Sequence, residues 1–338
     1  MRITYCYPFA VALCLCVAAN ADPIGLVLSG GGSKGAYEVG VWQELQAAGV
    51  ASNVTAISGT SVGALNAALF ATCPDAAERL WLENMEDVFT INTNRVGESL
   101  QTIVDNASNA VDVAEKTGED WKGLVAFGLA SLLHLADEYV NQVESPKKAI
   151  GYIDSSKLAT ALDEVLPKIW PSSTPFVYAT ALEKGSPGRP KTWCLNPESP
   201  ERRSLMIRAS AALPVGYDSV IIDGKVYVDG GWEARGGDNV PISPIVENHP
   251  DIKTIIVVYL KDERHLSAEQ RRRVRDFAQK SGVQLVEIIP SEDIGGGLGG
   301  WKGVVDFSPE TARRLIAIGR HDVRKVLNNA GMVKYAGL

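Results

Sequence analysis

The sequence is short of histidine, of metal-ligand spacings and of runs of like charge, and each shortage excludes a class of protein. It has only four histidines in 338 residues, and no usual metal-binding pattern appears, so we expect no metal or other cofactor. The formal net charge is −7 with no basic tail, which would repel phosphate backbones at long range. These features argue against a nucleic-acid-binding protein.

Cysteine is also scarce, and most of it lies near the start of the chain. Three of the five cysteines fall within the first 16 residues, and leucine precedes both Cys14 and Cys16. A small residue is expected before a lipidated cysteine, so a lipoprotein anchor is disfavoured. Cys73 and Cys194 lie far downstream, and two interpretations stay open for them: one disulfide, or two separately buried thiols.

The first 21 residues have the pattern of a secretory signal peptide. Arg2 is followed by an apolar stretch over residues 9–19, which ends in the small-residue sequence Ala-Asn-Ala at 19–21. A buried first strand would explain the apolar residues but not this arrangement. We therefore predict a leader over 1–21 and one domain over 22–338. The mature protein would be periplasmic or secreted, with membrane association left open.

The residues after the leader predict alternating strands and helices. Residues 24–28 are continuously apolar, as in a strand buried on both faces, and a helical pattern over 36–48 ends at Gly49. A second apolar strand over 54–57 precedes another helical pattern over 64–70. Such a βαβα unit forms a parallel sheet, whose loops after each strand meet at one carboxyl edge.

Residues of about 90–173 interrupt this alternation with mostly helical patterns, which predicts an inserted helical segment rather than a separate domain. Its apolar run over 121–135 is too short to span a bilayer. That run has two interpretations, a core helix or a lid over the active site. The α/β pattern returns with strands over 176–180 and 191–195, a hairpin over 219–228, strands over 254–260 and 283–289 and a closing helix over 309–327.

Residues 59–63 (GTSVG) match the G-x-S-x-G pattern of a nucleophile elbow. Gly59 and Gly63 would allow the tight turn from strand to helix that exposes the Ser61 hydroxyl. A match of five residues is common by chance, but here a predicted strand precedes it and a predicted helix follows it. The sequence therefore predicts that Ser61 is a nucleophile.

The glycine-rich loop over residues 30–35 (GGGSKG) could hold either a nucleotide's phosphates or a developing oxyanion. A dinucleotide site would need an acidic residue after the second strand, where the serine elbow stands. A phosphate-binding P-loop would need Ser or Thr after Lys34, where Gly35 stands. We therefore predict no nucleotide ligand. The predicted oxyanion-hole loop contains Gly30, Gly31, Gly32, Lys34 and Gly35.

No histidine is placed to act as the base for this serine. His134, His249, His265 and His321 do not follow predicted strands, so each is interpreted as structural or exposed. Asp229 does follow an apolar strand, and Gly230 and Gly231 come after it. Two glycines would let its carboxylate approach another loop closely, although Asp-Gly pairs are also common in simple turns, as at Asp223-Gly224.

Taken together, the GGGSKG loop, the GTSVG elbow and the DGG sequence at 229–231 resemble the patatin-like phospholipases, bacterial and exported members in particular. The flanking sequences at 209–214 and 239–241 are also similar to those of the family. The resemblance implies a three-layer α/β fold, with a central mainly parallel sheet, helices on both faces and the inserted helical segment.

The resemblance also implies a function. It is that of a serine lipid acyl hydrolase, which cleaves carboxylic esters of phospholipids or lysophospholipids with Ser61 as nucleophile, Asp229 as base and the glycine loop as oxyanion hole. The partner would be a lipid or membrane-surface substrate. Neutral glycerides or small esters are the alternative substrates, and a catalytically silent binding protein is the alternative class.

Overall fold

The computed structural model describes residues 22–88, 155–185, 188–213, 217–295 and 306–329. The predicted leader, the apolar run over 121–135 and most of the predicted helical insertion lie outside these residues and stay predictions. The last part of the insertion is described and contains helix α7 (Ser155–Val165). None of the described helices is long and apolar enough to cross a membrane.

Within the described residues, a mixed sheet of eight strands forms the centre of the fold, in the order β5-β6-β3-β2-β1-β7-β8, with β4 paired to β3 off this path. Strands β1, β2, β3, β7 and β8 pair in parallel, whereas β4, β5 and β6 join antiparallel. The strands are β1 (Ile24–Leu28), β2 (Val54–Thr60), β3 (Phe176–Glu183), β4 (Arg189–Cys194), β5 (Val220–Ile222), β6 (Lys225–Asp229), β7 (Thr254–Val258) and β8 (Gln284–Ile288).

Helices cover both faces of this sheet, because successive apolar residues of its central strands point in opposite directions. Leu26 and Leu28 of β1 belong to the large core cluster that includes α1, α2 and α12, whereas Val27 belongs to a second cluster with α9 and α10. The predicted three-layer α/β fold with a mainly parallel sheet is confirmed. The main helices are α1 (Gly35–Ala47), α2 (Val62–Thr72), α8 (Pro200–Ser210), α9 (Ser243–Asn248), α10 (Ala268–Lys280) and α12 (Pro309–Asn329). Two short helices, α3 (Pro74–Arg79) and α4 (Met85–Val88), flank a π-helical turn at Leu80–Asn84.

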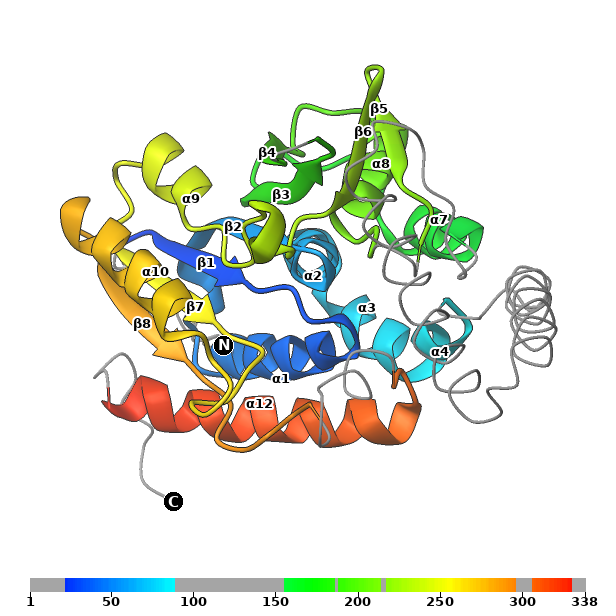
Figure 1. Cartoon of the computed structure of the whole chain (residues 1–338). Helices are drawn as coiled ribbons and strands as arrows, with labels where there is room; N and C mark the ends of the chain where they lie inside the picture. The colour runs from blue at the N-terminus through cyan, green and yellow to red at the C-terminus, as the bar shows by residue number, and fades with distance from the viewer. Residues whose placement is uncertain (1–21, 89–154, 186–187, 214–216, 296–305, 330–338) are drawn as a thin grey trace, which may run out of the picture.

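Helix α12 lies alongside α1, on the side of α1 that faces away from the sheet (Figure 1). The two helices cross at a pair of glycines. A Cβ atom on Gly40 would lie 2.0 Å from the carbonyl oxygen of Ile316, and one on Gly319 would lie 2.2 Å from that of Tyr37. The Tyr37 hydroxyl also donates to Asp322 Oδ2 at 3.1 Å. The closing helix therefore fixes α1, which begins directly after the glycine-rich loop.

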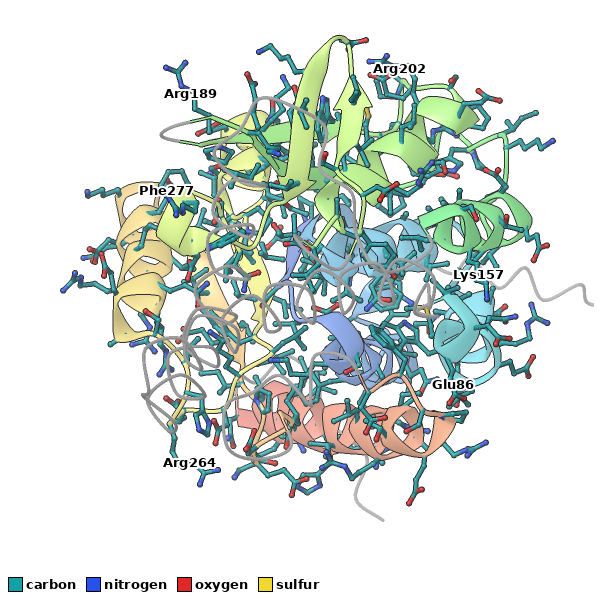
Figure 2. All side chains as sticks on the ribbon, turned by 45° about the vertical axis from the view of Figure 1, so that its right-hand side comes forward. Glu86, Lys157, Arg189, Arg202, Arg264 and Phe277 are labelled. Carbon is teal, nitrogen blue, oxygen red and sulfur yellow. The ribbon has the colours of Figure 1, made fainter. Side chains whose placement is uncertain are left out.

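The predicted hairpin is present, with Asp223 (φ 50°) and Gly224 (φ 76°) in left-handed conformations at its turn. Its second strand, β6, runs antiparallel to β3 and pairs Asp229 with Ala181. Charged side chains such as Arg202, Lys157 and Arg264 lie at the periphery of the molecule (Figure 2). Cys73 and Cys194 are free thiols in this structure, and each is partly exposed rather than fully buried.

Candidate active site

Ser61 occupies the turn between β2 and α2, with φ 57° and ψ −127°. A non-glycine residue with positive φ is strained, and such strain is typical of functional turns. The glycines on either side allow this turn to pack closely. A Cβ on Gly59 would lie 2.2 Å from the carbonyl oxygen of Gly63, and one on Gly63 would lie 2.5 Å from that of Leu28. The GTSVG sequence thus adopts the predicted elbow.

The Ser61 hydroxyl donates a hydrogen bond of 2.5 Å to Asp229 Oδ2. The sheet explains how residues so distant in sequence meet. Thr60, which precedes Ser61, pairs with Thr180 on β3, and the next residue of β3, Ala181, pairs with Asp229. Both side chains are largely buried, with 9% of Ser61 and 5% of Asp229 exposed. The site therefore contains a serine hydroxyl and a carboxylate in direct contact and shielded from water.

Burial raises the pKa of Asp229 to about 6, because removing the carboxylate from water disfavours its charge. Hydrogen bonds from the Ser61 hydroxyl and the Gly231 amide act in the opposite direction. The Gly231 amide donates to Oδ1 at 2.7 Å, which leaves Oδ2 to Ser61. A Cβ on Gly230 would lie 2.3 Å from the Thr180 carbonyl oxygen, so this glycine allows the DGG turn to lie against β3. The aspartate is thus a carboxylate near neutral pH with the basicity of a general base.

The side chain of Ser210 also holds the elbow in place. The Ser61 amide donates to Ser210 Oγ at 2.8 Å, and the Ser210 hydroxyl donates to the Thr180 carbonyl at 2.6 Å. The amide of Ser61 is therefore occupied and not available to an oxyanion. The sequence placed Ser210 only in a flank similar to the family's, and nothing in its local pattern indicates this role.

The glycine-rich loop contacts the elbow directly, since a Cβ on Gly30 would lie 3.0 Å from Ser61 Cβ. The side chain of Asn239 hydrogen-bonds to both backbone polar groups of Gly30. Its Oδ1 accepts from the Gly30 amide at 3.1 Å, and its Nδ2 donates to the Gly30 carbonyl at 3.3 Å. Within the part of the chain that the structure describes, the amides of Gly31 and Gly32 have no protein acceptor. These two amides are the available donors of the predicted oxyanion-hole loop.

Lys34 and Gly35 form the end of this loop and are both buried. Burial, and then the charge of Lys261, lowers the pKa of Lys34 to about 8, and Asp293 acts in the opposite direction. Gly35 begins α1, where a Cβ would lie 2.4 Å from Val62 Cγ2. The end of the glycine-rich loop therefore contacts the start of the nucleophile helix α2.

No described histidine hydrogen-bonds to Ser61 or Asp229. His249 Nε2 lies 2.9 Å from the Tyr178 hydroxyl, close to the amino end of β3, whereas Ser61 lies beyond the carboxyl end of the parallel strand β2. His265 pairs with Asp262, and His321 lies on α12. His134 lies outside the described residues. Among the described residues, Asp229 is thus the ionisable side chain that hydrogen-bonds to Ser61. The described residues also hold no group of three or more metal-binding side chains.

The family model of the patatin-like phospholipases matches residues 26–246, and the chain belongs to this family. The matched range includes the glycine-rich loop, the elbow and the DGG turn. A curated relative is the lysophospholipase nte1 of Aspergillus terreus, which is 48% identical over 52 residues. That match covers 15% of this chain and 3% of the fungal protein.

Three solved structures are similar at low sequence identity. VipD from Legionella pneumophila has a TM-score of 0.43 at 15% identity, with 91% of this chain and 67% of VipD covered. The type III effector ExoU, from Pseudomonas aeruginosa, has a TM-score of 0.42 at 18% identity, with coverages of 91% and 53%. Human GIVD cytosolic phospholipase A2 has a TM-score of 0.47 at 10% identity, with coverages of 93% and 60%. The chain thus spans about half to two thirds of the length of these proteins.

Proposed function

We propose that this chain is a serine lipid acyl hydrolase that cleaves carboxylic esters of phospholipids or lysophospholipids. The observation that carries the proposal is the hydrogen bond of 2.5 Å from the hydroxyl of Ser61, a residue held at positive φ, to the buried carboxylate of Asp229. Membership of the patatin-like phospholipase family supports a lipid ester as the substrate. The short match to a fungal protein named a lysophospholipase is consistent with the same class.

The reaction would proceed through an acyl-enzyme. Asp229 Oδ2 accepts the hydroxyl proton while Ser61 Oγ attacks the ester carbonyl carbon, and the Gly31 and Gly32 amides donate to the oxygen that becomes negative. The tetrahedral intermediate collapses, and the departing alcohol takes the proton from Asp229. Water then attacks the acyl-serine with Asp229 again as the base. Fatty acid is released, and the Ser61 hydroxyl is restored.

The test is the release of free fatty acid from phospholipid vesicles, followed by mass spectrometry. We expect release by the parent chain and a loss of about a thousandfold or more in Ser61→Ala and in Asp229→Ala, because each removes one half of the reacting pair. Circular dichroism must show that both variants are folded. Neutral glycerides and p-nitrophenyl butyrate serve as the comparison substrates. If the parent leaves all of these esters intact, the chain is a binding protein on the same scaffold.

The pH dependence of kcat/KM should identify the two groups with shifted pKa values. We expect activity to rise through pH of about 6, as Asp229 loses its proton, and to fall above about 8, as Lys34, a residue of the predicted oxyanion-hole loop, loses its charge. Lys34→Arg keeps that charge, so its alkaline limb should move to higher pH. Lys34→Gln should lower the plateau about tenfold and lack the alkaline limb. If the alkaline limb is unchanged in Lys34→Arg, another group must cause the fall in activity above pH of about 8.

A further inference from the structure

We propose that Glu38 and Asn66 are positioning residues of the active site, a carboxyl–amide pair that holds the glycine-rich loop against the first turns of the nucleophile helix. The inference rests on the proposed function and deepens it, because neither residue contacts the reacting atoms. Both are 0% exposed, although one is a glutamate. A polar group buried to this degree is costly unless it is hydrogen-bonded.

Asn66 makes the central connection. It lies on α2, little more than one turn after Ser61, and its Nδ2 donates to the Gly35 carbonyl at 2.9 Å and to Glu38 Oε2 at 2.8 Å. Gly35 is the last residue of the glycine-rich loop, and Glu38 lies in the first turn of α1 that follows it. One amide nitrogen therefore ties the end of the loop and the start of α1 to the helix that carries the nucleophile.

Trp81 completes this network from a third segment. Its Nε1 donates to Asn66 Oδ1 at 2.9 Å, which fixes the orientation of the amide and directs Nδ2 toward Gly35 and Glu38. The indole is almost fully buried, and its Cζ2 lies 2.7 Å from the position of a Cβ on Gly35. It stacks on Phe307 with ring centroids 6.1 Å apart. The amide can neither flip nor move away without leaving a buried donor or acceptor unpaired.

Burial favours the neutral form of Glu38 in this network. Burial raises the pKa of Glu38 well above the ordinary range and outweighs the opposite effects of the Asn66 side chain and the Ser29 backbone. The described residues provide no salt-bridge partner for it, and its Oε1 has no hydrogen-bond partner among them. A carboxyl group in either form can accept the hydrogen bond from the Asn66 amide. A glutamine would provide the same acceptor with the same shape.

The consequence for the reaction is geometric. Catalysis requires one carbonyl group to lie within reach of Ser61 Oγ and of the Gly31 and Gly32 amides together. The loop and the elbow leave different strands, β1 and β2, and the contacts among Gly35, Val62 and Asn66 fix their relative position. A change in this spacing should slow the chemical step more than it weakens the binding of a small ester.

The test measures kcat and KM on p-nitrophenyl butyrate, together with the rate of inactivation by a fluorophosphonate, which reacts with the same serine. We expect Glu38→Gln to remain within about twofold of the parent. Glu38→Leu should lower kcat and the inactivation rate about tenfold, with KM changed by less than about twofold. The matched control is Gln43→Leu, which removes another side-chain hydrogen bond of α1, to Glu78 at 2.8 Å, away from the loop. It should behave as the parent.

A folded Glu38→Leu variant with parental kcat would overturn the inference, as would a Glu38→Gln variant as slow as Glu38→Leu. If Glu38→Leu does not fold, Trp81→Phe decides instead, because it removes the donor to Asn66 and keeps an aromatic ring at this position. A threefold or greater loss of kcat supports the positioning role, and no loss contradicts it. A parent chain that hydrolyses no ester would refute the proposed function itself, which is a different result from an active parent with unaffected variants.

Discussion

Asp229→Asn should lower the rate of ester hydrolysis at least about a thousandfold, because asparagine cannot accept the proton of Ser61 and no other base among the described residues contacts that serine. The same substitution should make the protein more stable at pH 8. Among the described residues no cationic side chain pairs with this buried carboxylate, which accepts hydrogen bonds from the Ser61 hydroxyl and the Gly231 amide. An uncharged amide of the same shape avoids that desolvation.

The sign and size of the stability change follow from proton linkage. The pKa of Asp229 is about 6 in the folded chain, above the ordinary value, so its proton favours the folded state. Below pH of about 4, Asp229 is protonated in both the folded and the unfolded chain, and the parent's free energy of unfolding is highest relative to that of the variant. Between pH of about 4 and about 6 this difference should fall, and above about 6 it should stay constant. Above that pH, Asp229→Asn should be more stable by about 1–3 kcal/mol, since each unit of pKa shift corresponds to about 1.4 kcal/mol.

Urea denaturation of parent and variant at pH 4, 6 and 8, beside the fatty-acid assay, measures both effects. Asp223→Asn is the matched control on the same hairpin. Asp223 is exposed at the turn, and hydrogen bonds from Arg202 lower its pKa, so its neutralisation should not stabilise the protein. Asparagine also tolerates the positive φ at this position. An Asp229→Asn variant that is less stable than the parent at pH 8 would show that the buried carboxylate contributes favourably to folding.

The part of the active site that comes from neighbouring sequence, residues 30–63, could be predicted from the sequence alone. The glycine-rich loop and the Ser61 elbow each follow an apolar strand and precede a helical pattern, and adjacent parallel strands must bring both loops to one edge. Asp229 could be assigned only through the family resemblance. Its contact with Ser61 spans 168 residues and depends on β6 entering the sheet antiparallel to β3, which no local pattern specifies.

Burial around α1 could not be predicted either. The sequence indicates a helix with one apolar face, through Tyr37, Val41 and Leu45, yet the first two turns are buried all round, Glu38 included. The physical reason is that α2 covers one side of this helix and α12 covers another, and α12 comes from the far end of the chain. The same arrangement buries Glu38 and Asn66 behind the loop, so the pairing of a glutamate with an asparagine became visible only in three dimensions.

Gly319→Ala and Gly40→Ala should each destabilise the protein by at least about 2–3 kcal/mol, because the added Cβ would collide with backbone rather than with a movable side chain. The expected direction of this change is opposite to the usual effect of replacing glycine with alanine in a helix. In an open helix, alanine in place of glycine would stabilise by roughly 1 kcal/mol. Thermal and urea unfolding measure the change, and Ala317→Val, which adds volume at an exposed position of α12, should have little effect.

The helix crossing and the active site should also respond together. Helix α1 starts at the last residue of the glycine-rich loop, and Tyr37, whose carbonyl Gly319 contacts, lies one residue before Glu38. A folded Gly319→Ala variant must separate α1 from α12 or shift α1 toward the sheet, and either movement changes the position of the Gly31 and Gly32 amides relative to Ser61. We therefore expect a lower kcat on p-nitrophenyl butyrate in Gly319→Ala even at temperatures where it is fully folded. Parental stability in this variant would contradict the backbone contact. Lower stability with parental kcat would show that the packing of α1 against α12 does not influence catalysis.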